Sequence, residues 1–166
     1  MQLLISDANI LIDLEEGQLI ELMFQLPYQF SIPDILFYEE LEEEHQSLLD
    51  MGLQLSELSG DTMSYALELI PRYTRPSRND CFALALAAQE KCPLLTGDKD
   101  LRTAAEKESV MVRGTIWLVE MMVKQALITT DEARAAFQKM QETGRRLPWA
   151  VAEARLDELD KDNNNS

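Results

Sequence analysis

The sequence is poor in the residues that build disulfides, zinc sites and histidine-based active sites. Its 166 residues include two cysteines, Cys81 and Cys92, and one histidine, His45. The cysteines fall at the two ends of one expected helix, about 16 Å apart, whereas a disulfide needs Cα atoms within about 7 Å. His45 lies near the apolar stripe of its own expected helix, where a structural role is expected. A disulfide framework, a multi-histidine zinc site and a histidine-based triad therefore have little support.

Long apolar runs and glycine-rich phosphate loops are also missing. No stretch reaches the length of about eighteen apolar residues that a membrane-spanning helix needs, and the N-terminus lacks the features of a signal peptide. Neither GxxxxGK[ST] nor GxGxxG occurs in the chain. The length suits one domain with a sizeable core, and we expect a soluble, cytoplasmic protein.

Basic residues are scarce, with 15 Lys and Arg against 30 Asp and Glu, for a net charge of −15. Broad, nonspecific binding to nucleic acid is therefore not expected. Five basic residues nevertheless lie close in sequence to two of the acids discussed below: Arg72, Arg75, Arg78, Lys99 and Arg102. Two interpretations stay open, a local basic rim and an ordinary set of solvated surface charges.

Short apolar runs alternate with helical patterns along the chain. The expected strands are residues 2–6, 30–32, 53–58, 94–96 and 110–112. The expected helices are 14–25, 34–50, 60–71, 81–91, 101–107, 115–126, 130–142 and 148–159. This order predicts an α/β fold with helices around a mainly parallel sheet. We expect one domain in 1–126, a C-terminal helical extension of that domain in 127–159, and a disordered tail in 160–166, which has no apolar residue.

Acidic residues stand where strands and helices of this pattern meet. The first strand runs into Asp7, and Asp98 follows the strand that ends at Thr96. Asp80 opens the helix before that strand, and Glu40 lies early in the helix after the second strand. The carboxyl ends of parallel strands share one edge of the sheet, so these four acids can converge. Because carboxylates repel one another, their convergence indicates a site for a hard cation such as Mg²⁺ or Mn²⁺ and predicts metal-assisted phosphoryl chemistry.

Each acid also has a structural interpretation. Asp7 can cap the next segment, Asp80 can complete a capping box, and Asp98 can belong to a simple Gly-Asp turn. Taken together, the four placements favour a site over four separate caps. The run 39–44 offers five glutamates, and Glu40 is preferred because it flanks the apolar stripe nearest the strand end.

Neighbouring polar residues can support such a site. Asp100 is a candidate for a further metal ligand, with surface exposure as the alternative. Asn9 can orient a carboxylate or a water, and Ser6 and Thr96 can hydrogen-bond the acids from behind. Asp13 is expected to be the N-cap of the first helix.

The order of these segments and their local sequence motifs resemble those of PIN-domain nucleases. Residues 3–14 resemble the first-strand motif of that family, and residues 32–41 resemble its second acidic motif. Asp80 with the Ala-rich helix is similar to the third motif, and residues 94–101 are similar to the fourth, which is the most specific. The resemblance covers about residues 1–115, and the most similar subgroup is the toxin-type (VapC-like) ribonucleases of toxin–antitoxin modules.

The resemblance implies a three-layer α/β/α sandwich and Mg²⁺- or Mn²⁺-dependent hydrolysis of single-stranded RNA. It assigns the catalytic and metal-binding roles to Asp7, Glu40, Asp80 and Asp98, with Asp100 as a further ligand. It also implies homodimers and, in the toxin subgroup, a small antitoxin partner. The alternative is a catalytically silent PIN-like protein that serves in binding or regulation.

Overall fold

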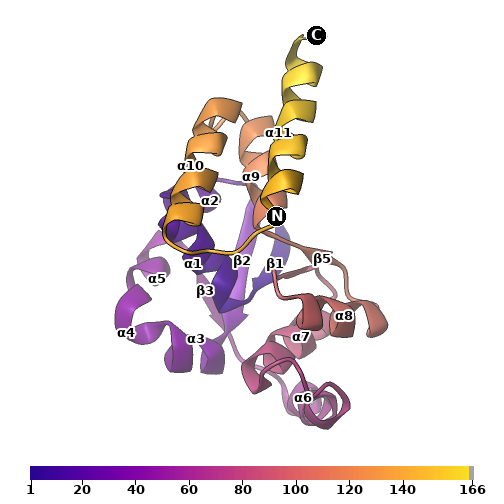
Figure 1. The fold of residues 1–166 in the computed structure, drawn as a ribbon. Coiled ribbons are helices and arrows are strands. Elements are labelled where there is room, and N and C mark those ends of the chain that lie inside the picture. The colour runs from indigo at the N-terminus through magenta and orange to yellow at the C-terminus, as the bar shows by residue number, and fades with distance from the viewer. Residues whose placement is uncertain (165–166) are drawn as a thin grey trace.

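A five-stranded parallel sheet runs through the centre of the computed structural model, which describes residues 1–164 (Figure 1). Its strands are β1 (Gln2–Ser6), β2 (Tyr28–Pro33), β3 (Gln54–Ser56), β4 (Leu94–Leu95) and β5 (Val112–Arg113). Their order across the sheet is β3-β2-β1-β4-β5, and each pairing is parallel. The five expected strands and the parallel sheet are therefore confirmed.

Helices cover both faces of this sheet, which makes the expected three-layer α/β/α sandwich. Figure 1 shows α1 (Ala8–Glu16), α2 (Ile20–Met23), α9 (Thr115–Lys124) and α10 (Thr130–Glu142) on one side. The helices α6 (Gly60–Arg72), α7 (Arg78–Glu90) and α8 (Lys99–Lys107) lie on the other. The centre of that second layer is α7, which packs against β1, β2 and β4 and is buried continuously from Cys81 to Ala87.

The first helix begins earlier than expected, and this changes the role of Asp13. Asp7 is itself the N-cap, and its side chain accepts a hydrogen bond from the Ile10 N–H, so α1 begins at Ala8. Asp13 consequently lies inside the helix and is buried. Its carboxylate accepts hydrogen bonds from Thr115 and Arg145, so the expectation of an N-cap at Asp13 is wrong.

The expected helix over 34–50 is broken into three short ones. They are α3 (Asp34–Glu40), α4 (Glu42–His45) and α5 (Ser47–Met51). The breaks fall in and beside the glutamate-rich run 39–44, where a continuous helix would stack like charges three and four positions apart.

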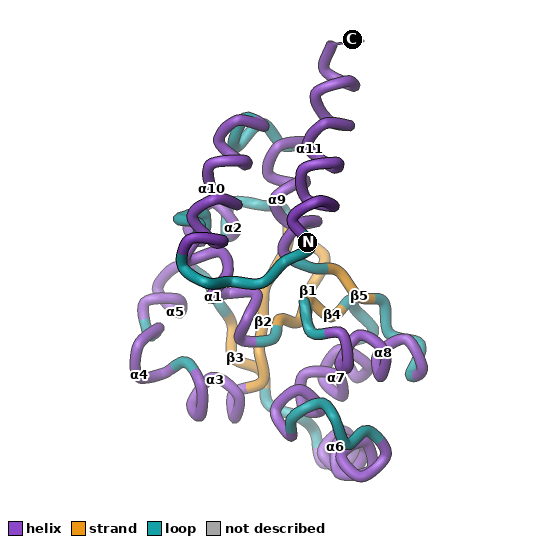
Figure 2. The backbone as a smooth tube through the Cα atoms, viewed as in Figure 1, coloured by secondary structure: helices purple, strands orange, loops and turns teal. Residues whose placement is uncertain are grey.

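The C-terminal segment is more ordered than the sequence predicts. After α10 the chain forms α11 (Trp149–Asn164), which projects beyond the rest of the molecule (Figure 2). The expected disordered tail is therefore wrong for residues 160–164, and residues 165–166 lie outside the described part of the chain. Asp160 explains the difference: its carboxylate accepts hydrogen bonds from Thr130 and Arg134 of α10, so polar contacts hold a segment that has no apolar residue.

Apolar side chains of the extension pack inside the molecule. Phe137, Met140, Leu156 and Leu159 are all buried, and α10 contacts α1, α9 and α11. Within residues 1–164, no helix is both long enough and apolar enough to cross a membrane.

Candidate functional site

Asp7 and Asp98 follow the two strands at which the sheet changes direction. From β1 the chain builds outward through β2 and β3, and it then returns to the other side of β1 to form β4 and β5. In open α/β sheets such a reversal opens a crevice at the carboxyl ends of the strands. Ser6 pairs with Leu95 across β1 and β4, which places Asp7 and Asp98 at this crevice.

Thr96 connects these two acids directly. Its hydroxyl donates a hydrogen bond of 2.6 Å to Oδ2 of Asp7 and accepts one of 3.0 Å from the Asp98 N–H. Asp98 then caps α8 by accepting a hydrogen bond from the Leu101 N–H. Ser6 acts on the backbone instead, since its hydroxyl donates to the carbonyl oxygen of Asp7.

Asp80 and Glu40 reach the same edge from α7 and α3. Asp80 completes a capping box with Ser77 at the start of α7. The adjacent Asn79 donates to the carboxylates of both Glu39 and Glu40, at 2.9 and 3.0 Å, and so ties the end of α3 to the start of α7. Asn79 was not among the predicted site residues, since its only local signal is its position next to Asp80.

The pKa values show that the acids lie close enough to influence one another. Burial raises the pKa of Asp7 to about 7, although hydrogen bonds from Thr96 and Ile10 oppose the rise, and the charge of Asp80 adds to it. Burial also raises the pKa of Glu40, again with a contribution from Asp80. The pKa of Asp80 is raised by burial and by the charge of Asp98. Asp80 is therefore the electrostatic centre of the four acids.

The acids fit a hard divalent cation in chemistry and charge, but they do not form a finished coordination shell. Their donors are carboxylate oxygens, which Mg²⁺ and Mn²⁺ prefer, and their mutual repulsion favours a cation among them. Across residues 1–164, however, no three acidic, histidine or cysteine side chains are arranged to hold a metal ion as they stand. Asp7, Asp80 and Asp98 each direct an oxygen to a helix cap instead.

The remaining supporting residues have different placements. Asp100 lies half-buried in the first turn of α8, two residues after the Asp98 cap. The side-chain oxygen of Asn9 accepts a hydrogen bond from Arg145. His45 bonds Glu15 at 2.7 Å, which agrees with the structural role expected for it.

Four of the five expected basic residues lie at or near this edge. Arg78 opens α7 and lies over the ring of Phe82, and the exposed Arg75 precedes it. Lys99 opens α8, and the N–H of Arg102 bonds the carbonyl oxygen of Asp98.

Arg72 does not belong with this group. Its guanidinium bonds the carboxylate of Glu108, which also accepts hydrogen bonds from Tyr65 and Tyr73. Glu108 lies beyond the far end of α8, roughly 15 Å along the helix from Asp98. We therefore correct the expectation that Arg72 contacts RNA beside the acids.

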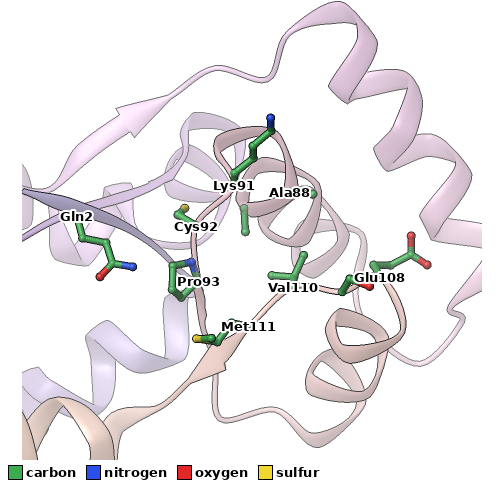
Figure 3. A pocket seen from close by; sticks show the side chains of 10 residues that line it. Gln2, Ala88, Lys91, Cys92, Pro93, Glu108, Val110 and Met111 are labelled. Atoms are coloured by element: carbon green, nitrogen blue, oxygen red, sulfur yellow. The ribbon is translucent and has the colours of Figure 1, made fainter.

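A separate cavity of about 440 Å³ lies at the opposite edge of the sheet (Figure 3). Its lining includes Gln2, the first residue of β1, and Pro93, which precedes β4, together with Met111 and Glu108. These residues mark the amino ends of the strands, so this cavity is not part of the acidic site.

A family model described as DUF3368, a PIN domain, matches residues 3–161. The chain belongs to this PIN-domain family. The match includes the C-terminal extension, whereas the motifs recognised in the sequence end near residue 115. The comparison with curated proteins returns no match.

Two solved structures are similar to this PIN domain. VapBC2 from Rickettsia felis, bound to a DNA fragment from their promoter, has a TM-score of 0.50 at 17% identity and covers 68% of this chain and 98% of its own. A PilT N-terminus domain protein from Sulfolobus solfataricus has a TM-score of 0.47 at 17% identity, with coverage of 71% and 90%. At these identities the likeness shows the fold alone.

Proposed function

We propose that this PIN domain is a divalent-metal-dependent endoribonuclease that hydrolyses phosphodiester bonds of single-stranded RNA. The observation that carries the proposal is the placement of Asp7 and Asp98 after the paired strands β1 and β4, where Thr96 bonds both residues and the Asn79–Glu40 contact joins α3 to the start of α7 beside Asp80. A carboxylate-only donor set suits Mg²⁺ or Mn²⁺. Membership of the PIN family supports the same function.

The protein groups position the acids and supply no nucleophile of their own. When bound, a divalent ion lowers the pKa of water and stabilises negative charge on a phosphate. Thr96 and the Ile10 N–H hold the Asp7 carboxylate at the crevice, and the Leu101 N–H holds that of Asp98. The one histidine is bonded to Glu15, so we assign the attack on the phosphate to water.

Replacement of single acids tests this proposal. Asp98→Asn should lower the rate of RNA cleavage in Mn²⁺ by orders of magnitude, because activation of the water is lost while asparagine still caps the helix. Asp61→Asn is the matched control, since Asp61 occupies the first turn of α6, outside the acidic site. Cleavage is measured on a labelled single-stranded RNA, with and without EDTA. Cleavage that persists in EDTA would overturn the metal mechanism. Cleavage that persists in both Asp7→Asn and Asp98→Asn would overturn it as well.

The two glutamates that share Asn79 provide a finer test of the same site. Glu40 is coupled to Asp80, so we assign the metal-binding role to Glu40 and not to Glu39. Glu40→Gln should therefore reduce cleavage strongly and Glu39→Gln only slightly, although both side chains accept from the same amide.

We also propose that the nuclease is the toxin of a toxin–antitoxin module and binds a small antitoxin. This rests on the shared fold and on the VapBC assembly that the Rickettsia felis structure contains. A homodimer is part of the same proposal. Within residues 130–159, however, the large apolar side chains are mostly buried and only Val151 is strongly exposed, so a dimer interface there would be largely polar.

A further inference from the structure

We propose that a basic cleft beside the acids binds the stretch of single-stranded RNA that flanks the scissile bond. This inference rests on the proposed function and extends it to the path of the substrate. The cleft has a volume of about 600 Å³, which is within the range of ligand-binding pockets. Its walls come from the end of β5, from α9 and from the segment that leads into α11, and Figure 1 shows α9 and α11 close together above β5.

The cleft gathers positive charge in a strongly acidic protein. Five of the 15 basic residues line it: Arg102, Arg113, Lys124, Arg146 and Arg155. The one acid in the lining, Glu120, already pairs with Arg155 at 3.4 Å. Arg102, Arg113, Lys124 and Arg146 form no ion pair with any residue in 1–164, whereas Arg72, Arg134 and Arg145 are all bound to carboxylates. The positive charge of the cleft is therefore available to a ligand.

The cleft begins at the acidic site itself. Gly97 belongs to its lining and stands between Thr96, which holds Asp7, and Asp98. The Thr96 N–H bonds the carbonyl oxygen of Arg113, and Arg102 lies one helical turn after the Asp98 cap. A single-stranded RNA with one phosphate over Asp98 can thus continue into the cleft on the β5 side.

An aromatic contact favours a nucleic acid over an acidic peptide as the occupant. The guanidinium of Arg113 lies over the ring of the half-buried Trp117, 5.8 Å from its centroid. An arginine guanidinium beside an aromatic ring offers a cationic surface on which an unpaired base can stack. A basic groove combined with stacking surfaces is the usual arrangement for single-stranded nucleic acid, whereas an acidic peptide needs only the charges.

A cluster of polar contacts ties the segment before α11 to α1 and to the start of α9. Arg145 donates to Asp13 at 2.6 Å and to Asn9 at 3.2 Å, and Asp13 also accepts a hydrogen bond of 2.7 Å from Thr115 in the wall of the cleft. The next residue, Arg146, belongs to the lining of the cleft, so the contacts of Arg145 fix the backbone beside it. This arrangement gives the C-terminal extension a function in binding the substrate.

Binding of a labelled single-stranded RNA decamer in the cleavage-deficient Asp98→Asn background tests the inference without turnover. The Lys124→Gln/Arg146→Gln pair should weaken binding about tenfold, and the log–log salt slope should become shallower by about 1.4, because two phosphate contacts are lost. The matched control is Lys107→Gln/Lys139→Gln, which removes the same charge from exposed positions outside the cleft. Melting curves check that each pair folds.

The outcomes separate this inference from the proposed function. A loss of RNA binding confined to the cleft pair supports the cleft, even if the wild-type protein were to show no metal-dependent cleavage and so overturn the nuclease proposal. An equal loss of RNA affinity in the cleft pair and the control pair, or no loss in either, would overturn the proposed role of the cleft. Neither result would bear on the role of the acids. Poly-glutamate that competes with RNA at equal affinity would also overturn it, because the occupant would then be an acidic polypeptide.

Discussion

Asp7 occupies a position that disfavours its own charge. The residue is only 2% exposed, and burial raises its pKa to about 7 despite the hydrogen bonds that it accepts from Thr96 and Ile10. A lone structural cap has no reason to be buried beside further acids. This conflict is relieved by a cation, either a proton or a metal ion, and it explains why Asp7 is an informative residue to test in the metal-free protein.

The stability of the metal-free protein should therefore depend on the protonation of Asp7. Its pKa is 3.8 when unperturbed and about 7 in the fold, so the folded chain binds the extra proton between these values. The free energy of unfolding should consequently fall as the pH rises from about 4 through about 7. Asp7→Asn carries no charge and keeps a good N-cap, so its stability should fall less over this range, because only the raised pKa values of Glu40 and Asp80 remain, and it should exceed the wild type in stability at pH 8. Urea unfolding in EDTA at pH 5 and pH 8 measures the effect. An equal pH dependence in the two proteins would contradict the raised pKa.

Single residues also show where sequence reasoning stops. Asp7 and Asp98 could be found because the end of a strand is a local pattern. Asn79 and Arg145 could not, since they act on partners at positions 40 and 13, far away in the sequence. Asp13 was misinterpreted for a related reason: a helix start was expected beside it, whereas Asp7 already caps that helix.

At the scale of elements, the strands were predictable and some helix boundaries were not. The short apolar runs fix the strands, but the helix expected over 34–50 breaks near Leu41, inside the glutamate run and next to the two glutamates that accept from Asn79. The polar contact between α6 and the end of α8 was likewise invisible in the sequence. It depends on Glu108, whose carboxylate accepts from two tyrosine hydroxyls and from Arg72.

Removal of the Glu108 charge should loosen this contact without affecting cleavage. Glu108→Gln should lower the free energy of unfolding by about 1 kcal/mol at pH 7, because hydrogen bonds to a charged group are lost at a partly exposed site. The hydroxyls of Tyr65 and Tyr73 lower the pKa of Glu108, so its contribution is present above an unperturbed pKa of 4.5 and is lost as the pH falls below it. The difference from the wild type should therefore shrink as the pH falls from 4.5 through the lowered pKa of Glu108. Glu106→Gln, an exposed change on the same helix, is the control, and altered RNA cleavage would contradict the structural role.

At the scale of the molecule, the order of the strands places the acids together and the extension adds the cleft. The sequence motifs predicted that the acids converge, because these motifs lie within residues 1–115. The basic cleft could not be predicted from the sequence. Its basic residues are scattered from position 102 to position 155 and become neighbours only when α11 packs on α9. The net charge of −15 conceals this local excess of positive charge.

This contrast between the local and the overall charge predicts an unusual salt dependence for RNA association. At about 10 mM salt the Debye length is about 30 Å, so the whole acidic protein repels an approaching RNA. At about 150 mM it is about 8 Å, which screens the distant acids but spares contacts inside the cleft. The association rate constant should therefore rise over this range, and it should fall at higher salt as the cleft contacts weaken. In Lys124→Gln/Arg146→Gln the rise should remain while the later fall becomes smaller. Stopped-flow fluorescence with a labelled RNA in the Asp98→Asn background measures both the rise and the fall. An association rate constant that falls steadily from the lowest salt would contradict this prediction, because local attraction and not the net charge would then govern the encounter.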